Sequence, residues 1–292
     1  MSALPSEFPS VAQDPQKKLL TLRANLRVMG RLLVAYSGGV DSAFLAWVAS
    51  RELAGKMMAV LADSPSLARS QKRDAVAFAE EQQIPLTIVN TEELDRLDYR
   101  RNDGARCFHC KDELFTVMEE FRQQNGYETI AYGVNMDDQG DYRPGQKAAH
   151  QHGVAAPLLD AGLTKEDIRR LAEEAGLRVW DKPASACLAS RIEYGRAVTR
   201  EALSAVEEGE EALKQLGFRQ FRVRHHGQIV RIEIAKDELA RAMTTEMAAE
   251  FTRIFKALGF IYVTLDMEGF RSGSMNALLS VDHLRRSGSE RS

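Results

Sequence analysis

The first two thirds of the chain alternate short apolar runs with longer segments in which apolar residues recur at helical spacing. Short apolar runs bounded by glycine or polar residues are typical of buried strands. We expect strands at residues 32–36, 57–62, 86–89 and 129–132. We expect helices at residues 19–29, 41–53, 68–82, 111–123 and 163–175. In the last of these helices, Thr164 followed by Asp167 is close to a capping box.

Strands that alternate with helices predict an α/β fold, with a doubly wound, mostly parallel sheet covered on both faces. Ligands of such folds bind in the crevice beyond the carboxyl ends of the strands. Three segments directly follow expected strands: residues 37–42, the segment at Ser64, and residues 133–135. We therefore expect these segments to converge on one crevice.

The pattern changes near Gly195. A helix is expected at residues 200–216, helical segments at 236–258 and a last strand at 260–265. Alternating strands are expected at residues 218–223 and 228–234, joined by the hairpin signal His225-His226-Gly227. This α-β-β-α-β order predicts a small α+β domain. The expected division is a flexible leader at 1–18, the α/β domain at 19–195, the small domain at 196–275 and a disordered tail at 276–292.

The composition is that of an ordinary globular protein, with 44% hydrophobic and 28% charged residues in a chain of 292. A net charge of -3 provides no global basic field, so nucleic acid is not expected as a partner. No apolar run is long enough to span a bilayer, and the N-terminus lacks the pattern of a signal peptide. We therefore expect a cytoplasmic protein with no membrane partner. Three cysteines are too few, and odd in number, for a disulfide framework.

The motif Ser-Gly-Gly-Val-Asp-Ser occupies residues 37–42, between an expected buried strand and an expected helix. Its glycines let the backbone approach a ligand closely, and the helix offers free N–H groups and the positive end of its dipole to an anion. Ser37 and Ser42 add hydroxyl groups, and Asp41 is placed to cap the helix or to hold a magnesium ion. No lysine follows the second glycine, so the loop differs from the Walker type. The competing interpretation, a glycine turn that only connects strand to helix, is the weaker one for this pattern.

This motif is the hallmark of the PP-loop ATP pyrophosphatase family, which the chain resembles from about Leu33 to Arg191. The resemblance implies an adenine nucleotide alpha hydrolase-like fold, and ATP with Mg²⁺ as cofactors. It also implies cleavage of ATP between the α- and β-phosphates, because members adenylate a substrate oxygen and release pyrophosphate. The nucleotide contacts that it implies are Ser37, Gly38, Gly39, Asp41, Ser42, Ala62, Asp63, Ser64, Gly133, Asn135 and Asp138. Arg143, Lys182 and Arg191 are further candidates for phosphate or adenylate contacts, and Glu193 for a metal ligand.

Cys107 and Cys110 form a C-x-x-C just before an expected helix, and Cys187 lies far downstream in a stretch without periodicity. A helix N-terminus lowers the pKa of a thiol, so thiolates are expected here. Three interpretations remain open. The cysteines are ordinary half-buried thiols, or they bind zinc with His109, or their three thiolates hold a [4Fe–4S] cluster with one iron open to an external ligand.

Four separated motifs are similar to those of the LarE family of ATP-dependent sulfur transferases, which build a nickel-pincer nucleotide cofactor. They lie at residues 106–111, 132–138, 141–145 and 182–191, and the resemblance extends from about Leu19 to Gly273. It implies that a pyridinium-3,5-biscarboxylic acid mononucleotide is adenylated on a carboxylate and converted to a thiocarboxylate. One kind of member surrenders the sulfur of a lone cysteine, and the other carries a C-x-x-C pair and a cluster that relays sulfide. The chain resembles the second kind, which implies Cys107, Cys110 and Cys187 as cluster ligands, Cys187 as the catalytic residue, and sulfide or a sulfur donor as a partner.

The phosphate of such a substrate needs a receptor. Arg222 and Arg224 alternate with apolar residues on an expected strand, so they project to one face, and paired guanidinium groups suit phosphate. The family places such a pair near the active site. The alternative is a solvated strand face. Arg231 and Glu233 on the next strand are weaker candidates. The resemblance also implies a homo-oligomer, a hexamer.

If only the motif at residues 37–42 (the phosphate loop) is considered, other functions also fit. A tRNA-thiolating enzyme would carry a basic surface and an RNA-binding appendage, which the net charge does not favour. An amide-forming synthetase of the NAD synthetase type would not need three cysteines. A non-catalytic nucleotide-binding module would bind ATP without releasing pyrophosphate.

Overall fold

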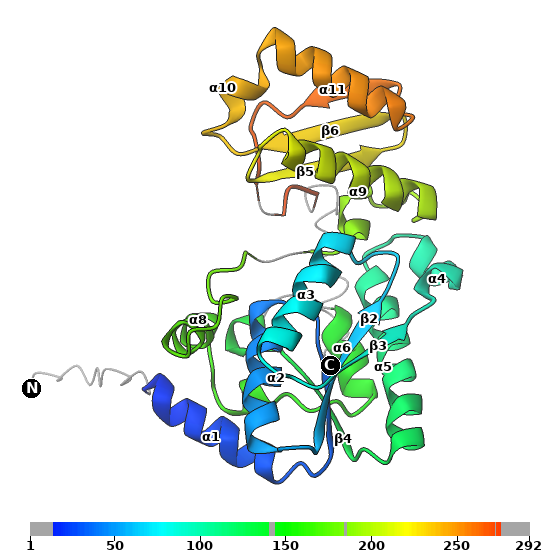
Figure 1. The fold of residues 1–292 in the computed structure, drawn as a ribbon. Coiled ribbons are helices and arrows are strands. Elements are labelled where there is room, and N and C mark those ends of the chain that lie inside the picture. Colours follow the sequence, from blue (N-terminus) through cyan, green and yellow to red (C-terminus); the bar gives the residue numbers. More distant parts are fainter. Residues whose placement is uncertain (1–13, 140–143, 184–185, 272, 276–292) are drawn as a thin grey trace, which may run out of the picture.

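A computed structural model describes residues 14–139, 144–183, 186–271 and 273–275. Its first part is built on a parallel four-stranded sheet with the strand order β3-β2-β1-β4 (Figure 1). The strands are β1 (Leu32–Ala35), β2 (Met57–Asp63), β3 (Leu86–Asn90) and β4 (Thr129–Tyr132). All four strands lie within one residue of the predicted limits. Between β1 and β4 the strand order reverses, and in doubly wound sheets this switch point is where ligands bind.

Helices cover both faces of this sheet, as predicted. The helices are α1 (Pro15–Arg27), α2 (Val40–Glu52), α3 (Arg69–Glu81), α4 (Leu97–Arg100), α5 (Arg106–Asn125), α6 (Pro144–Gln151), α7 (Pro157–Asp160) and α8 (Lys165–Glu174). Leu32 and Val34 of β1 pack against α1, α2 and α8, whereas Leu33 and Ala35 pack against α5 and α6. Because both faces are covered, every residue of β1 is buried, which explains its uninterrupted apolar sequence.

The C-terminal part has the predicted α-β-β-α-β order. Its elements are α9 (Arg200–Gln215), β5 (Phe221–His226), β6 (Ile229–Ile234), α10 (Leu239–Ala242), α11 (Thr245–Ala257) and β7 (Tyr262–Leu265). β5 and β6 are antiparallel, and β6 and β7 are parallel. β5 starts at Phe221 rather than 218 and continues through His226, so the hairpin turns at Gly227, whose φ is +72°.

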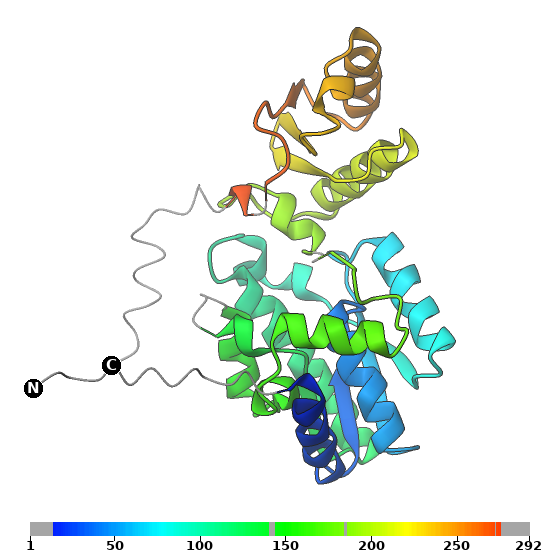
Figure 2. The same ribbon diagram turned by 90° about the vertical axis from the view of Figure 1, so that its left-hand side faces the viewer.

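The two sheets lie toward opposite ends of the molecule (Figure 2). Short 3-10 helices interrupt the loops of the first part. These are η1 (Glu93–Asp95), η2 (Met136–Asp138) and η3 (Leu188–Arg191). The core of the C-terminal part is not confined to that part, because Tyr99 of α4 and Leu188 of η3 belong to the same apolar cluster as Val223 and Phe255. The domain limits therefore stay a prediction. No helix among the described residues is both long and apolar enough to cross a membrane.

Two helices begin earlier than predicted. α1 begins at Pro15, where Asp14 accepts a hydrogen bond from the N–H of Gln16, and proline suits the first helical position. α5 begins at Arg106, five residues before the predicted Lys111, so the C-x-x-C lies inside its first turns. The apolar periodicity that marks a helix starts only after this segment, which is why the sequence pattern missed it. The predicted capping box of α8 is confirmed: Thr164 and Asp167 each accept the other's backbone N–H.

His152 joins the end of α6 to α5. Its Nε2 lies 3.0 Å from Asp112 Oδ1 and its Nδ1 lies 3.0 Å from Glu119 Oε1. Its ring also packs 5.9 Å from that of Phe115. Burial acts to lower the pKa of His152, but the hydrogen bonds and charges of the two carboxylates outweigh it, so the pKa is raised. The two carboxylate contacts of His152 therefore hold the end of α6 against α5, and the raised pKa favours the imidazolium form.

The stabilisation by His152 is expected to depend on pH. The folded-state pKa lies above the unfolded value of about 6.5, so the contribution is complete below pH 6.5 and is lost as the pH rises through the folded value. We predict that His152→Gln lowers the free energy of unfolding more at pH 6 than at pH 8.5, as measured by urea denaturation. His150→Gln, an exposed position on the same helix, is the control. An equal loss at both pH values would contradict the charged clamp.

Candidate functional site

The loop between β1 and α2 is folded around its two serine side chains. Ser42 Oγ accepts a hydrogen bond from the N–H of Ser37 at 3.1 Å, and the two hydroxyl oxygens lie 3.0 Å apart. Ser42 Oγ also donates to the carbonyl of Gly39 at 3.2 Å. The first N–H groups of α2 have no partner within the helix, and no side chain caps them. The loop is thus a preformed concave turn with the character of an anion site.

Two glycines of the site have no room for a side chain. Gly38 has a φ of +71°, and a Cβ there would lie 2.5 Å from the Cβ of Ala75. Gly133, just after β4, has backbone atoms of the phosphate loop against it: a Cβ would lie 2.8 Å from the N and 2.9 Å from the Cα of Ser42. The predicted convergence of residues 37–42 with residues 133–135 is therefore present, at the switch point of the sheet.

Asp41 is held from two directions. Asn135 Nδ2 donates to Asp41 Oδ1 at 3.2 Å, and Lys165 Nζ forms an ion pair with Asp41 Oδ2. Asn135 is in turn fixed by a capping box with Asp138 at the start of η2. The sequence interpretation included Asn135 and Asp138 but missed Lys165. The signal that the sequence offered for Lys165 is its position, since it is the first residue of a capped helix that follows the motif at residues 132–138.

The end of β2 and the loop after it form a further side of the candidate site. Asp63 is paired with Arg69 and Lys72, and Ser64 Oγ donates to Glu93, which is 1% exposed. Burial acts to raise the pKa of Asp63, but the hydrogen bonds and charges of Lys72 and Arg69 outweigh it and lower the pKa. Both carboxylate oxygens of Asp63 are thus already paired with neighbouring side chains. The predicted Ala62 is the neighbouring residue of the same strand end.

Lys182 reaches the phosphate loop from the segment after α8. Its Nζ donates to the carbonyl of Gly38 at 3.1 Å. Its pKa is lowered, mainly by burial, with an opposing effect of Asp74 and a further lowering by Arg178. The predicted Lys182 therefore lies at the loop, whereas the predicted Arg143 lies outside the described residues.

The segment that carries Cys187 is tied to the start of α5. Arg106 donates to the side chain of Asn102 and, at 2.9 Å, to the carbonyl of Ala189. Asn102 Nδ2 donates to the carbonyl of Glu193 at 2.9 Å. Asn102, Arg106 and Ala189 are all buried. These contacts bring residues from the two distant cysteine motifs together.

The same cysteine segment is hydrogen-bonded to the loop after β2. The N–H of Leu188, next to Cys187, donates to the carbonyl of Ser66 at 2.8 Å. Ser66 in turn donates its N–H to Ser64 Oγ at 3.0 Å, and its hydroxyl pairs with Tyr99. Ser66 was not singled out from the sequence, because nothing in its own segment indicates a partner more than a hundred residues away.

Arg191, predicted as a phosphate contact, is 2% exposed and satisfies its donors within the chain. It binds the carbonyl of Cys187 at 3.0 Å and Glu210 of α9 at 3.0 Å. It therefore positions Cys187 against the C-terminal part. Glu193, a predicted candidate for a metal ligand, pairs with Arg196 and His226 instead.

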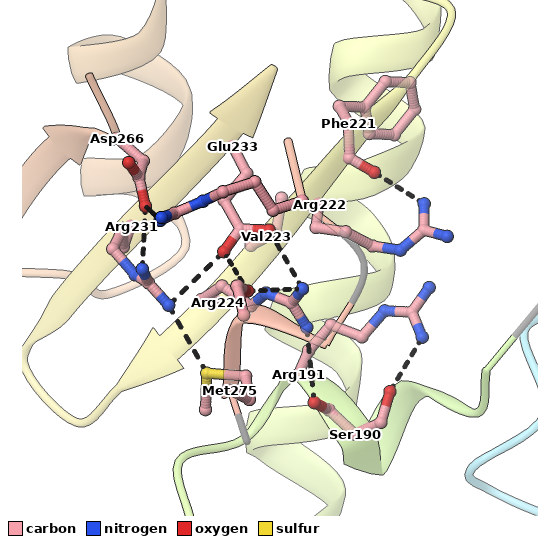
Figure 3. Close-up of polar contacts among 12 residues, drawn as sticks. Ser190, Arg191, Phe221, Arg222, Val223, Arg224, Arg231, Glu233, Asp266 and Met275 are labelled. Atoms are coloured by element: carbon pink, nitrogen blue, oxygen red, sulfur yellow. Dashed lines mark hydrogen bonds and ion pairs between the residues drawn. The ribbon is translucent and has the colours of Figure 1, made fainter. Parts of the chain in front are cut away.

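Arginines gather on one face of the C-terminal sheet, beside η3 (Figure 3). Arg224 is buried and binds Glu233 at 2.9 Å, Ser274 at 3.0 Å and the carbonyl of Ser190 at 3.4 Å, while its Nε has no partner among the described residues. Arg231 shares the same carboxylate of Glu233 at 3.3 Å. Glu233 is fully buried, so it acts as the counter-ion that holds this arrangement.

Arg222 differs from its neighbour Arg224. It donates to the carbonyl of Phe221 at 2.6 Å and lies over the ring of Phe270, and it forms no ion pair among the described residues. Burial, followed by repulsion from Arg191 and Arg224, lowers its pKa, although Glu210 opposes the effect. This local excess of positive charge is suited to an anion.

The comparisons with known proteins bear on the identity of this site. An uncharacterised protein of Synechocystis sp. is 38% identical over 265 residues, which cover 91% of this chain and 99% of that protein. The pyridinium-3,5-bisthiocarboxylic acid mononucleotide synthase of Lactiplantibacillus plantarum is 33% identical over 264 residues, which cover 90% of this chain and 95% of the enzyme. The chain belongs to the LarE family. An uncharacterised protein of Methanocaldococcus jannaschii is 27% identical over 259 residues, and no protein-family model matches.

Cys107 and Cys110 of this LarE-family chain do not match the expectation of a helix-activated thiolate, because the pKa of each thiol is raised, chiefly by burial. Burial, followed by repulsion from Cys187 and Glu93, raises the pKa of Cys110 to about 12. The prediction was wrong for Cys110 because the thiol lies in the second turn of α5, packed against the apolar cluster, rather than at a solvated helix end. Cys107 is exposed and Cys187 is half-buried.

The arrangement was tested against the two metal groups considered from the sequence. In the described ranges, no three His, Cys, Asp or Glu side chains converge on one point as a single zinc ion needs. A cubane cluster instead binds each thiolate through a different iron, so its ligands do not share a point. Cys107, Cys110 and Cys187 lie close enough to influence one another electrostatically, and an all-thiol donor set suits iron–sulfur chemistry.

A concavity of about 450 Å³ lies elsewhere, lined by residues of the α9 start, the β5–β6 turn and the α11 end. None of the predicted site residues lines it. The candidate site at the loops of the sheet edge is therefore separate from this concavity.

Replacing Gly133 with alanine is expected to displace the phosphate loop, because the new Cβ would collide with the backbone of Ser42. We predict a loss of ATP affinity, measured by isothermal titration, together with about 1–3 kcal/mol of stability. Gly153→Ala is the control, because its φ of +61° imposes strain while its Cβ meets nothing within 4 Å. Unchanged ATP binding by Gly133→Ala would show that the close approach has no functional role.

Arg222 and Arg224, the two predicted ligands of the substrate's phosphate, are expected to contribute differently to stability. Glu233→Gln removes the counter-ion of buried Arg224, which should cost about 3–5 kcal/mol of unfolding free energy. Arg222→Gln breaks no ion pair among the described residues and should cost less than about 1 kcal/mol. Thermal and urea unfolding would measure both. Similar losses for the two variants would contradict the distinction.

Proposed function

We propose that this chain is an ATP-dependent sulfur transferase that adenylates a carboxylate of pyridinium-3,5-biscarboxylic acid mononucleotide and replaces one of its oxygens with sulfur. The name of the L. plantarum relative supports this assignment, because it denotes a bisthiocarboxylic acid mononucleotide as the product. A product with two thiocarboxylates would require the sequence of steps to occur twice on each substrate.

The observation that carries the proposal is the physical link between the loop after β2, which we assign to the nucleotide site, and the segment of Cys187. Ser66 joins the two, since it is bound to Ser64 on one side and to Leu188 on the other. An activating site and a sulfur-bearing segment that share a loop suit a reaction in which adenylation must be followed by sulfur attack. A plain nucleotide-binding module would not need this connection.

The first step is activation. A carboxylate is a poor acyl electrophile because its oxygen leaves poorly. We assign the loop at residues 37–42 to the β- and γ-phosphates of ATP and Asp41 to Mg²⁺. The substrate oxygen then attacks the α-phosphorus, the bond to the β-phosphate oxygen breaks, and pyrophosphate leaves. The acyl adenylate that remains has AMP as a good leaving group. Free N–H groups at the start of α2 would stabilise the departing charge.

The second step is sulfur attack on the acyl carbon, with release of AMP and formation of a thiocarboxylate. Cys107, Cys110 and Cys187 would hold a [4Fe–4S] cluster, which supplies an iron site for an external sulfide. The protein's own contribution is to position Cys187 through Arg191 and Leu188. The alternative is that Cys187 surrenders its own sulfur, which would limit each chain to one sulfur.

The substrate's phosphate would bind at the arginine face of the C-terminal sheet. Arg222 offers a guanidinium group that forms no ion pair among the described residues, and Arg224 offers its Nε, which has no hydrogen-bond partner among them. Arg191 connects this face to Cys187 through its backbone carbonyl. A substrate held here by its phosphate would present its ring toward the cysteine segment.

The proposal predicts that Cys187→Ser separates the two steps. The variant should release pyrophosphate in a substrate-dependent manner, because the activating residues are intact, but should form no thiocarboxylate. Coupled pyrophosphate detection and mass spectrometry of the nucleotide products would measure the two steps. An amide-forming synthetase would be indifferent to this substitution, and salt-sensitive tRNA binding in a filter assay would favour the RNA-thiolating alternative.

The proposed [4Fe–4S] cluster can be tested separately. Anaerobic reconstitution with iron and sulfide should give a brown protein whose iron content falls in Cys107→Ala and Cys110→Ala. If iron is not retained, and these two variants still complete several turnovers, the three-thiolate assignment is wrong and Cys187 acts alone.

A further inference from the structure

Two buried hydroxyl groups are paired near the cysteines. The hydroxyl groups of Ser66 and Tyr99 are hydrogen-bonded to each other, and the two residues are 3% and 1% exposed. Together they hold two protons, but the hydrogen bond between them uses only one. Whichever hydroxyl donates, the other keeps a proton that has no acceptor among the described residues. Because buried donors are rarely left without an acceptor, a further acceptor is expected at this pair.

The sulfur atoms of two cysteines lie beside Tyr99. Tyr99 belongs to a buried apolar cluster, against which Cys110 and Cys187 pack. The N–H of Leu188, the residue after Cys187, donates to the carbonyl of Ser66 at 2.8 Å, which connects the cysteine segment to the hydroxyl pair. Burial, followed by the influence of Cys187 and then of Cys110, raises the pKa of Tyr99. The phenol therefore keeps its proton at neutral pH and remains a hydrogen-bond donor beside these sulfurs.

The charge of a sulfur atom decides how well it accepts this proton. A thiol sulfur is a weak acceptor, and Tyr99 is bonded to Ser66 rather than to a cysteine. Metal binding turns cysteine thiols into thiolates, and charge-assisted hydrogen bonds are about twice as strong as neutral ones. A thiolate is therefore a better acceptor for the phenol than Ser66 is. Of the two sulfurs, that of Cys187 acts more strongly on the phenol.

We propose that Tyr99 donates a hydrogen bond from its hydroxyl to the thiolate of Cys187, while Ser66 turns its own proton to the Tyr99 oxygen. The inference rests on the proposed function, in which Cys187 is a thiolate ligand of the cluster. Both protons of the pair then have acceptors, which satisfies the buried donor. Tyr99 is thereby a positioning residue, because it fixes the direction of the Cys187 side chain and draws negative charge from its sulfur.

The reconstituted full chain offers measurements other than turnover. Hydrogen bonds to cysteine sulfur tune an iron–sulfur cluster and stabilise its reduced, more negative state. Tyr99→Phe keeps the buried ring, so it should make the reduction potential more negative without removing the core packing. It should also raise the rate of iron loss to a chelator about 10-fold, the size of effect expected when a metal ligand loses its hydrogen-bond partner. In wild type, transfer to D₂O should shift the iron–sulfur stretching bands of the resonance Raman spectrum, and Tyr99→Phe should reduce this shift.

Two control variants isolate the bond to sulfur. Ser66→Ala removes the other hydroxyl of the pair but keeps the backbone hydrogen bonds of residue 66 to Ser64 and Leu188. It should leave the reduction potential close to the wild-type value. Tyr36→Phe removes a buried phenol hydroxyl that donates to the carbonyl of Ala75 at 2.8 Å in the other apolar core. It should lower stability, measured by urea unfolding, without moving the potential.

The outcomes separate the two proposals. If wild type holds the cluster and Tyr99→Phe changes neither the potential nor the deuterium shift, the inference is overturned while the proposed function stands. Equal changes of potential in Ser66→Ala and Tyr99→Phe would assign the effect to the packing of the hydroxyl pair and would also overturn it. A wild-type spectrum without a deuterium shift would do so without any variant. If wild type holds no cluster, the three-thiolate assignment of the proposed function fails, and the inference fails with it.

Discussion

The site depends on the close approach of two backbones at the switch point of the sheet. β1 and β4 are hydrogen-bonded neighbours, so the loops that follow them meet, and the second loop passes the first with no space for a Cβ at Gly133. This proximity lets Asn135 reach Asp41, and the capping box of Asn135 with Asp138 then fixes the start of η2. A parallel pair with this order therefore decides where the anion-binding turn lies and what surrounds it.

The second half of the site is attached to the first by buried polar contacts. Arg106, Asn102 and Ser66 each bind a backbone group of the segment around Cys187. Backbone groups that are buried must be paired, so these contacts fix the path of a segment that has little regular structure of its own. Arg191 continues the connection to Glu210 of α9. The loop after β2, the cysteine segment and the arginine face are thus joined by one continuous series of hydrogen bonds.

Much of the fold could be predicted from the sequence, because the strands of a doubly covered parallel sheet are continuous apolar runs and its helices show a clear period. The phosphate loop was also predictable, since its glycines and serines act within six residues. Lys165 was not, because its partner Asp41 is 124 residues away, and no local pattern reports such a distance. The two arginines of β5 look identical in sequence. Only the pairing of Arg224 with Glu233 across the strands separates a buried, anchored guanidinium from an available one.

The burial of Cys110 and Glu93 sets a condition on the sulfur step. Glu93 has one oxygen bound by Ser64, and its other oxygen has no partner among the described residues. A carboxylate with such limited hydration repels negative charge on nearby sulfur and so favours the neutral thiol of Cys110. Any process that turns these thiols into thiolates must bring positive charge with it or remove the negative charge of Glu93. Metal binding releases thiol protons for that reason. The surroundings of Cys110 are therefore compatible with a group that brings cations with it, and they disfavour a free thiolate of Cys110 at neutral pH.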